Sequence, residues 1–316
     1  MNFDPTLKTQ VKNLVGLSPR QGKNLIKTER YLVAYLKRHG IKVVIEKFPV
    51  TIPEATKASL MIDGELIPCL SCSFVGGAIE NKETILSSTI PSRYNLDLPN
   101  INFNPLSAAI CRNNFYFAPA LAVARKHVSR IARAKNILGR VDIEKFRGQA
   151  AHLLVGNSHN PRSVVFAHYD SVGKGATDNA SGVAVLLRLI VEFPETLAST
   201  LYVFDGNEEL SYDYPTYWGH GFRVFEDRHN LLLANSEQII TVDCVGNGPT
   251  EESSDPNMLR LDFPIKNSAK WASKTSSLSG DFPKLMAVYH SDADIPDQLS
   301  EKYLREAVNV LRKKVG

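Results

Sequence analysis

The stretch that decides the fold is residues 163–209, which read SVVFAHYDSVGKGATDNASGVAVLLRLIVEFPETLASTLYVFDGNEE. Residues 164–167 form a short apolar run, which is typical of a strand buried on both faces. A turn-rich loop follows, and residues 183–190 repeat apolar positions densely enough for a buried helix. Residues 201–204 then form a second short strand. This order of strand, loop, helix and strand predicts an α/β fold whose reactive edge lies at the carboxyl ends of its strands.

Ionisable residues follow the ends of these predicted strands. The same arrangement recurs at two later apolar runs, residues 239–242 and 285–288, which we also predict as strands. The residues that follow the four strand ends are His168 and Asp170, Glu208 and Glu209, Asp243, and Tyr289 and His290. Because the carboxyl ends of parallel strands meet at one edge of a sheet, we expect these side chains to converge there.

The residue types of this set indicate a metal site. Asp178 adds a carboxylate near the start of the predicted helix, where negative charge is favoured. Imidazoles and carboxylates without a thiolate suit Zn²⁺, Mn²⁺, Co²⁺ or iron. The expected ligands number too many for one catalytic zinc, which keeps about three, but they fit two ions that share a carboxylate. We therefore expect two metal ions per chain, of zinc, manganese, cobalt or iron, bound by His168, Asp178, Glu209, Asp243 and His290.

Two further carboxylates suggest supporting roles. Asp170, two residues after His168, is placed to orient that imidazole. Glu208 and Glu209 are adjacent in a predicted loop, so their side chains can diverge. One of them can bind metal while the other takes a proton from a metal-bound water.

Composition excludes several classes of protein. The chain has 316 residues, 43% hydrophobic and 22% charged, which is ordinary globular composition. A net charge of +4 is too small to indicate a nucleic-acid or membrane partner. Four cysteines do not make a disulfide framework, and the start of the chain shows no apolar signal core. We therefore expect a protein of the reducing cytoplasm, without a nucleic-acid or membrane partner.

The flanking sequence predicts scaffold and an insert. Residues 19–39 predict an amphipathic helix and residues 41–48 a strand. Prolines punctuate residues 52–146, which predict an inserted, mainly β subdomain with strands at 58–62 and 108–111. Asp63-Gly64 is typical of a hairpin turn. Cys69 and Cys72 form a CxxC without further soft ligands nearby, so we interpret them as packing residues rather than a zinc site.

The remaining segments complete the prediction. Basic residues 125–140 predict a helix with a solvated face. Residues 141–146 and 150–155 predict two paired strands. The aromatic loop at 210–221 either walls the site or packs as a separate cluster, and residues 300–315 predict a closing helix.

The motifs around the predicted ligands resemble the M28 family of zinc aminopeptidases. They are HYD, DNASG ten residues after the histidine, the Glu-Glu pair, VDCVG and YHSDAD, in that order. The resemblance covers residues 1–51 and 147–316. It implies a mixed, largely parallel central sheet flanked by helices, with the insert where some members hold a protease-associated subdomain.

The resemblance also implies two zinc ions per chain, with Mn²⁺ or Co²⁺ as alternatives, and a role for each residue. One metal takes His168, Asp178 and Asp243, and the other takes Asp178, Glu209 and His290, so that Asp178 bridges. Glu208 is then the general base, and Tyr289 helps to hold the substrate carbonyl. The implied reaction is removal of an N-terminal residue from a peptide by attack of a metal-bridging hydroxide.

Glutaminyl cyclases, a related branch, are an alternative. They use one zinc and share FDG before the Glu pair and a longer loop after it. They usually read DSA where this chain has residues 178–180, and carry Trp where Tyr289 stands. A different amidohydrolase and an inactive relative are further alternatives, and the intact Glu208 argues against the inactive one.

Overall fold

The structure is a computed structural model that describes residues 6–80, 85–87 and 97–316. The chain divides into two compact units. The first contains Met1–Val50, Gly148–Phe282 and Ile295–Gly316, and the second contains Thr51–Arg147 and Pro283–Asp294. Residues 81–84 and 88–96 of the predicted insert lie outside the described residues. The segment Pro283–Asp294, which the sequence analysis places in the catalytic domain, groups with the second unit.

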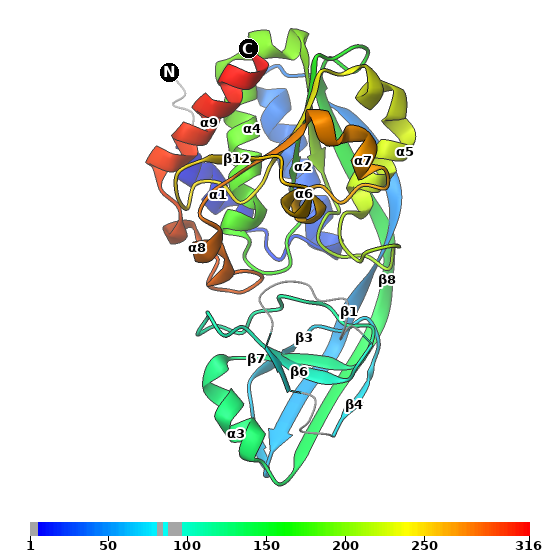
Figure 1. Cartoon of the computed structure of the whole chain (residues 1–316), viewed down its shortest axis with the longest axis vertical. Helices are drawn as coiled ribbons and strands as arrows, with labels where there is room; N and C mark the ends of the chain where they lie inside the picture. The colour runs from blue at the N-terminus through cyan, green and yellow to red at the C-terminus, as the bar shows by residue number, and fades with distance from the viewer. Residues whose placement is uncertain (1–5, 81–84, 88–96) are drawn as a thin grey trace. The chain divides into compact units, whose positions relative to one another are not determined.

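A mixed sheet forms the centre of the first unit (Figure 1). Its strand order is β12-β13-β11-β9-β10-β8-β1, where β1 and β8 are long strands that continue into the second unit. Pairing is parallel from β13 through β11 and β9 to β10, and antiparallel at β12 and β8. The bounds are β1 Val44–Ile62, β8 Ile137–Gly156, β9 Ser163–His168, β10 Thr200–Asp205, β11 Gln238–Val242, β12 Glu251–Ser253 and β13 Thr275–Ser279.

Helices cover both faces of this sheet (Figure 1). On one face α1, α4 and α9 contact one another and α4 contacts β9. On the other, Phe222 of α5, Trp271 of α7 and Phe263, which follows α6 directly, are buried against strand residues that include Phe166. Burying one such side chain contributes about 1.5–3 kcal/mol. The bounds are α1 Leu7–Val15, α2 Gly22–Arg38, α4 Ser181–Glu192, α5 His220–Asn235, α6 Pro256–Asp262, α7 Ser268–Trp271 and α9 Glu301–Val315.

The second unit is built around β structure. A four-stranded sheet has the order β3-β7-β6-β5, with β3 Cys69–Ser71, β7 Ala120–Val123, β6 Asn100–Phe103 and β5 Ile85–Ser87. Within this unit β2 (Glu65–Leu66) pairs with the end of β1, and β4 (Gly77–Ile79) pairs with the start of β8. Among its described residues, this unit has the α-helices α3 (Val128–Arg133) and all but the first residue of α8 (Phe282–Met286).

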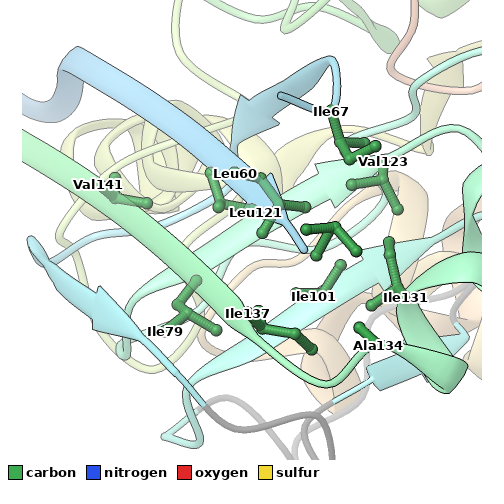
Figure 2. Close-up of a cluster of buried hydrophobic side chains, with 11 residues drawn as sticks. Leu60, Ile67, Ile79, Ile101, Leu121, Val123, Ile131, Ala134, Ile137 and Val141 are labelled. Atoms are coloured by element: carbon green, nitrogen blue, oxygen red, sulfur yellow. The ribbon is translucent and has the colours of Figure 1, made fainter. Parts of the chain in front are cut away.

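An apolar cluster holds the second unit together (Figure 2). It brings Leu60 of β1, Leu121 of β7 and Ile131 of α3 against Ile137 and Val141 of β8. Leu60, Leu121, Ile131 and Val141 are fully buried. Since these residues come from strands and a helix far apart in sequence, the cluster gives this unit a core of its own.

Several predicted elements agree with the structure. The fold class is confirmed: a mixed, largely parallel sheet is flanked by helices. The hairpin at Asp63-Gly64 is also confirmed, because both residues have positive φ and Ile62 pairs with Glu65. The helix over 300–315 is α9, and Leu304, Ala307, Val308 and Leu311 are buried as the spacing requires.

Four predicted elements are wrong in the second unit and at its boundary. Residues 141–146 and 150–155 are one strand, β8, because residues 147–149 stay extended. The helix over 125–140 ends at Arg133, since the following backbone N–H groups of Lys135 and Asn136 donate to Asp63 instead. Residues 108–111 form a bend followed by irregular backbone rather than a strand. Residues 285–288 form no strand either: they lie in α8 and the turn after it, where Pro283 suits a helix start.

The N-terminal segment differs in detail. The helix predicted at 19–39 begins at Gly22, with Gln21 as its first flanking residue, and α1 precedes it. A hydrogen bond of 2.6 Å from Gln10 to Tyr35 joins the two helices. Among the described residues, no helix combines the length and the apolar character that crossing a membrane requires.

Candidate metal centre

The sheet register places the predicted ligands of the first unit side by side. His168 ends β9 and pairs with Asp205 at the end of β10, three residues before Glu208. Thr241 of β11 pairs with Phe166, so Asp243 lies level with His168, two residues further along each chain. As a result His168 Nε2 is 3.4 Å from Asp243 Oδ1. The parallel sheet therefore delivers these side chains to one edge.

Asp178 reaches the same position from a different element. It belongs to the turn Ala176–Ala180 that precedes α4, and its Oδ1 is 3.2 Å from His168 Nε2. One ligand atom each from His168, Asp178 and Glu209 lie within 4.8 Å of one another, and so do atoms of Asp178, Asp243 and Cys244. Four of the five predicted ligands are thus brought together.

The buried carboxylate of Asp170 fixes this cluster through hydrogen bonds. Its carboxylate accepts hydrogen bonds from His168 Nδ1 (3.2 Å), from the backbone N–H groups of Glu208 (3.1 Å) and Glu209 (3.0 Å), and from Gln21 Nε2 (3.1 Å). Because a carboxylate accepts, the His168 proton sits on Nδ1 and Nε2 is left as the metal-binding nitrogen. One buried acid therefore orients the imidazole and both glutamate backbones.

Asn179 fixes the other side of the cluster. Its side chain donates to the carbonyl of Val242 at 2.8 Å and accepts from the N–H groups of Gly182 (2.9 Å) and Cys244 (3.4 Å). This amide ties the turn that carries Asp178 to the strand end that carries Asp243. Gly182 is required here, because a Cβ would overlap both Val242 O and Asn179 Oδ1. Asn179 was not predicted as a site residue. Its position directly after the predicted ligand Asp178 is the sequence feature that could have indicated its role.

The fifth predicted ligand, His290, belongs to the second unit. Its backbone φ is +52°, its Nδ1 lies 3.1 Å from the carbonyl of Arg112, and Arg112 N donates back to its carbonyl. A carbonyl accepts, so Nδ1 carries the proton and Nε2 is the nitrogen suited to a metal. The Tyr289 ring stacks on the imidazole with centroids 3.7 Å apart. Whether both residues join the first unit's ligands stays a prediction.

The charges of the cluster favour a cation. Burial lowers the pKa of His168, but the charge of Asp243 and hydrogen bonds to Asp170, Asp178 and Asp243 outweigh it and raise the pKa well above its ordinary value. Burial raises the pKa of Glu208 well above the ordinary range; the charge of His168 opposes this rise, and that of Glu209 adds to it. So many buried carboxyl groups around one imidazole call for compensating positive charge, which a divalent ion supplies.

The donor set also fits zinc. Two donors each about 2.1 Å from a tetrahedral zinc lie about 3.4 Å apart. The distances from His168 Nε2 to Asp178 and Asp243, 3.2 Å and 3.4 Å, match that separation. The residues present are therefore those that an imidazole- and carboxylate-bound zinc requires.

Two acids near the cluster were missed from the sequence, the partly buried Asp262 and the fully buried Asp205. Asp262 of α6 accepts a hydrogen bond of 2.6 Å from Ser277, and burial together with the charge of Asp243 raises its pKa to about 7. Asp205 lies 3.5 Å from His152, and burial together with the charge of Asp170 raises its pKa to about 7. These contacts join distant strands and helices, so no local motif could have indicated them.

The aromatic loop at 210–221 is anchored by a buried arginine. Arg223 binds Asp213 at 2.9 Å, Thr216 at 3.1 Å and the carbonyl of Trp218 at 2.8 Å. Trp218 contacts Tyr217 and donates to the carbonyl of Arg260, while Tyr214 is 85% exposed. Packing by Tyr217 and Trp218 favours the separate-cluster interpretation for that part of the loop.

Part of the chain matches a known family in sequence, and nearly the whole chain matches solved structures in fold. Residues 150–253 match the sequence model described as Peptidase family M28, which confirms the resemblance seen in the motifs. A sequence comparison with curated proteins finds no match.

Solved structures share the architecture. The zinc aminopeptidase BSAP from Bacillus subtilis aligns with a TM-score of 0.65 at 14% identity, over 97% of this chain and 92% of that one. The aminopeptidase from Aneurinibacillus sp. strain AM-1 gives 0.59 at 14%, over 96% and 92%. Porphyromonas gingivalis glutaminyl cyclase gives 0.53 at 13%, over 98% and 96%. At these identities the likeness establishes the fold.

Proposed function

From the match of residues 150–253 to peptidase family M28, we propose that this protein is a zinc-dependent aminopeptidase that removes N-terminal residues from peptides. The observation that carries the proposal is the convergence of His168, Asp178, Glu209 and Asp243, with Glu208 buried beside them. An imidazole and three carboxylates at one sheet edge are a metal-binding set, and an adjacent glutamate outside that set is a candidate base.

The residues that would hold zinc divide into two sets. His168, Asp178 and Asp243 form the first, in which Asp170 fixes the imidazole. By the family resemblance, Asp178 and Glu209 would form the second with His290. Bound zinc supplies a Lewis acid for the peptide carbonyl and lowers the pKa of a nearby water.

Glu208 is proposed as the general base. Its backbone N–H donates a hydrogen bond to Asp170. This bond fixes the backbone of Glu208 and does not use the Glu208 carboxylate. Burial raises the pKa of Glu208, and a raised pKa suits a group that must accept a proton from water and pass it to the leaving amine. Tyr289 is proposed to hold the substrate carbonyl, by the same resemblance.

Glutaminyl cyclase is the second candidate, because the P. gingivalis cyclase shares the fold and the chain has Asp205-Gly206 before its Glu pair. The two candidates differ in metal number and in product. A peptidase of this kind is expected to use two zinc ions, whereas a glutaminyl cyclase is expected to use one.

The test combines a metal count with a substrate screen. Metal-replete protein should hold two zinc ions per chain by elemental analysis and release free amino acid from aminoacyl amides. One tightly bound ion together with ring closure of an N-terminal glutamine would instead establish the cyclase. Turnover of neither substrate would refute both.

Location and substrate follow as further proposals. Cys69, Cys72, Cys111 and Cys244, all within the described residues, are free thiols, which fits a reducing cytoplasm. Burial raises the pKa of Cys69 to about 11 and of Cys72 above its usual range, so both are neutral packing residues. We propose a small peptide substrate, without nucleic-acid or membrane partners.

A further inference from the structure

Arg20 is a fully buried arginine in the first unit, two residues before α2 begins at Gly22. Taking a guanidinium group out of water costs free energy unless hydrogen bonds inside the protein replace those made to water. The partners of this side chain therefore show what the buried charge is used for.

The guanidinium group donates to four backbone carbonyls of a single loop. Its Nε donates to Tyr169 O at 2.7 Å, and its Nη2 donates to Asp170 O at 3.3 Å and to Gly175 O at 3.0 Å. Its Nη1 donates to Lys174 O at 3.2 Å and to Ser18 Oγ at 2.9 Å. These bonds use all five N–H groups of an arginine side chain.

This loop joins the segments that carry two predicted metal ligands. Residues 169–175 begin directly after His168 and end at the turn that contains Asp178. The carbonyl of Gly175 accepts from the guanidinium group and also from a backbone N–H of that turn, at 3.2 Å. Arg20 thus bonds to both ends of the connection between the two ligands.

The packing around Gly175 shows that the loop closes tightly on the guanidinium group. Its φ is +59°, a conformation that favours glycine. A Cβ at this position would overlap Asp178 O and the side chain of Ser171, and it would crowd Arg20 Nη2. The backbone N–H of Arg20 also donates to Ser171 Oγ at 3.2 Å. The loop therefore has one arrangement that satisfies these contacts together.

We propose that Arg20 is a positioning residue for the metal centre, an inference that rests on the proposed function. Its hydrogen bonds hold the loop so that His168 Nε2 and Asp178 Oδ1 lie 3.2 Å apart, close to the spacing of two donors to one tetrahedral zinc. A loop that is already held in this arrangement loses less conformational entropy when the ion binds. In this role Arg20 acts through the loop and does not bind the ion itself.

Lysine is the informative replacement at this position. It keeps the positive charge, but an ammonium group has three donors in place of five and lacks the planar fork. Arg20→Lys should therefore loosen the loop. Zinc affinity should fall by about 10–100-fold, the range expected when a group that orients metal ligands is lost.

Arg223 is the matched control, because it is another buried arginine of the first unit that anchors a loop. Its side chain donates to four residues, none of which is a predicted ligand: Asp213, Thr216, Trp218 and Pro264. Both Arg20→Lys and Arg223→Lys should lower the free energy of unfolding of the metal-free protein. Only Arg20→Lys should weaken zinc binding, which a purely structural arginine would leave unchanged.

Zinc affinity is measured on metal-free protein by competition with a chromogenic chelator. Urea unfolding in excess chelator measures stability, and circular dichroism confirms that each variant is folded during the titration. Ser18→Ala is a milder second variant, because it removes one partner of Nη1 and leaves the arginine in place. The loss of one such hydrogen bond should lower zinc affinity by about 2- to 10-fold.

The outcomes separate this proposal from the proposed function. Wild-type zinc affinity in Arg20→Lys overturns the positioning role, and so does an equal loss of affinity in Arg223→Lys. If Arg20→Lys does not fold, wild-type affinity in Ser18→Ala overturns it instead. Wild-type protein that binds no zinc overturns the proposed metalloenzyme together with the role of Arg20.

Discussion

Two histidine–aspartate pairs in the first unit differ in their protonation although they have similar geometry. His168 Nδ1 is 3.2 Å from Asp170, and His152 Nε2 is 3.5 Å from Asp205, with all four side chains at most 2% exposed. The pKa of His168 is raised well above its ordinary value, whereas burial lowers the pKa of His152 to about 3. Distance to one carboxylate therefore does not decide the charge of a buried imidazole.

The surroundings of each ring account for the difference. His168 faces Asp178 and Asp243 on its other nitrogen, so three carboxylates stabilise its charged form or a metal in its place. His152 Nε2 bonds at 2.9 Å to the carbonyl of Gly221, and its ring packs against Phe48 and Phe225. Glycine at 221 is required, because a Cβ there would overlap Asp205 Oδ1.

The two pairs have different roles in the first unit: one is part of the core, and the other is part of the metal-binding cluster. Burial favours the neutral form of both partners in the His152–Asp205 pair, which then acts as part of the core. At the cluster, charge accumulates beyond what one imidazole can neutralise, which prepares the site for a divalent ion. The following predictions test this contrast.

The largest effect is expected at the reacting end of the cluster. Glu208→Gln should lower kcat by about 10²–10⁴-fold, because the amide cannot accept the proton, and should leave metal content near wild type. Glu209→Gln should lose one metal together with activity, because a ligand is removed. Elemental analysis and steady-state kinetics measure both. Loss of metal from Glu208→Gln alone would mean that the two roles are exchanged.

The buried pair should be sensitive to pH rather than to metal. The folded pKa of Asp205 is about 7, against an ordinary value of 3.8, so the folded protein binds that proton more tightly than the unfolded chain. This contribution to stability is fully present below about pH 4 and is lost as pH rises through about 7. Asp205→Asn lacks it, so the free energy of unfolding of the variant minus that of the wild type should rise by about 4 kcal/mol across this range.

Urea unfolding at pH 5 and pH 8, with a chelator present, measures the part of that change that falls between these two pH values, about 3 kcal/mol. His152 is common to both proteins, so its own opposite pH dependence largely cancels in the comparison. A difference that stays constant with pH would show that Asp205 is ionised in the folded protein.

Asp170 should matter for metal binding where Asp205 does not. Asp170→Asn replaces one acceptor oxygen by a donor, which disturbs the hydrogen bond of His168 or the backbone N–H of Glu208 or Glu209. Zinc affinity should fall by about 10–100-fold. Asp205→Asn is the matched control and should keep wild-type affinity in a competition titration with a chromogenic chelator. Equal losses in both variants would remove the distinction between the two pairs.

The smallest effect is expected at Gln21. Its amide donates to Asp170 Oδ2 at 3.1 Å from the flanking residue of α2. Because one hydrogen bond contributes about 1 kcal/mol, Gln21→Ala should lower zinc affinity by no more than about 10-fold. The same chelator competition measures it. A larger fall than for Asp170→Asn would place the control of His168 orientation in α2 instead.

Local sequence determined the elements that carry the cluster. The apolar runs before His168 and Asp243 are β9 and β11, and the dense apolar repeat after Asp178 is α4. These elements can be predicted because a strand buried on both faces and a helix buried on all sides consist of nearly continuous apolar sequence. Residue chemistry at the strand ends then indicated a metal, and the ordered motifs indicated the family.

Only the tertiary structure decided which distant residues meet. Residues 285–288 are apolar like a strand, yet β13, with the polar sequence TSSLS, takes the place beside β11. Sheet neighbours are chosen by pairing across the whole chain, which a local pattern does not encode. For the same reason the thiol of Cys244 beside Asp243 and the neutral pair of His152 and Asp205 emerge from packing alone. Their chemistry depends on burial and on neighbours far away in sequence.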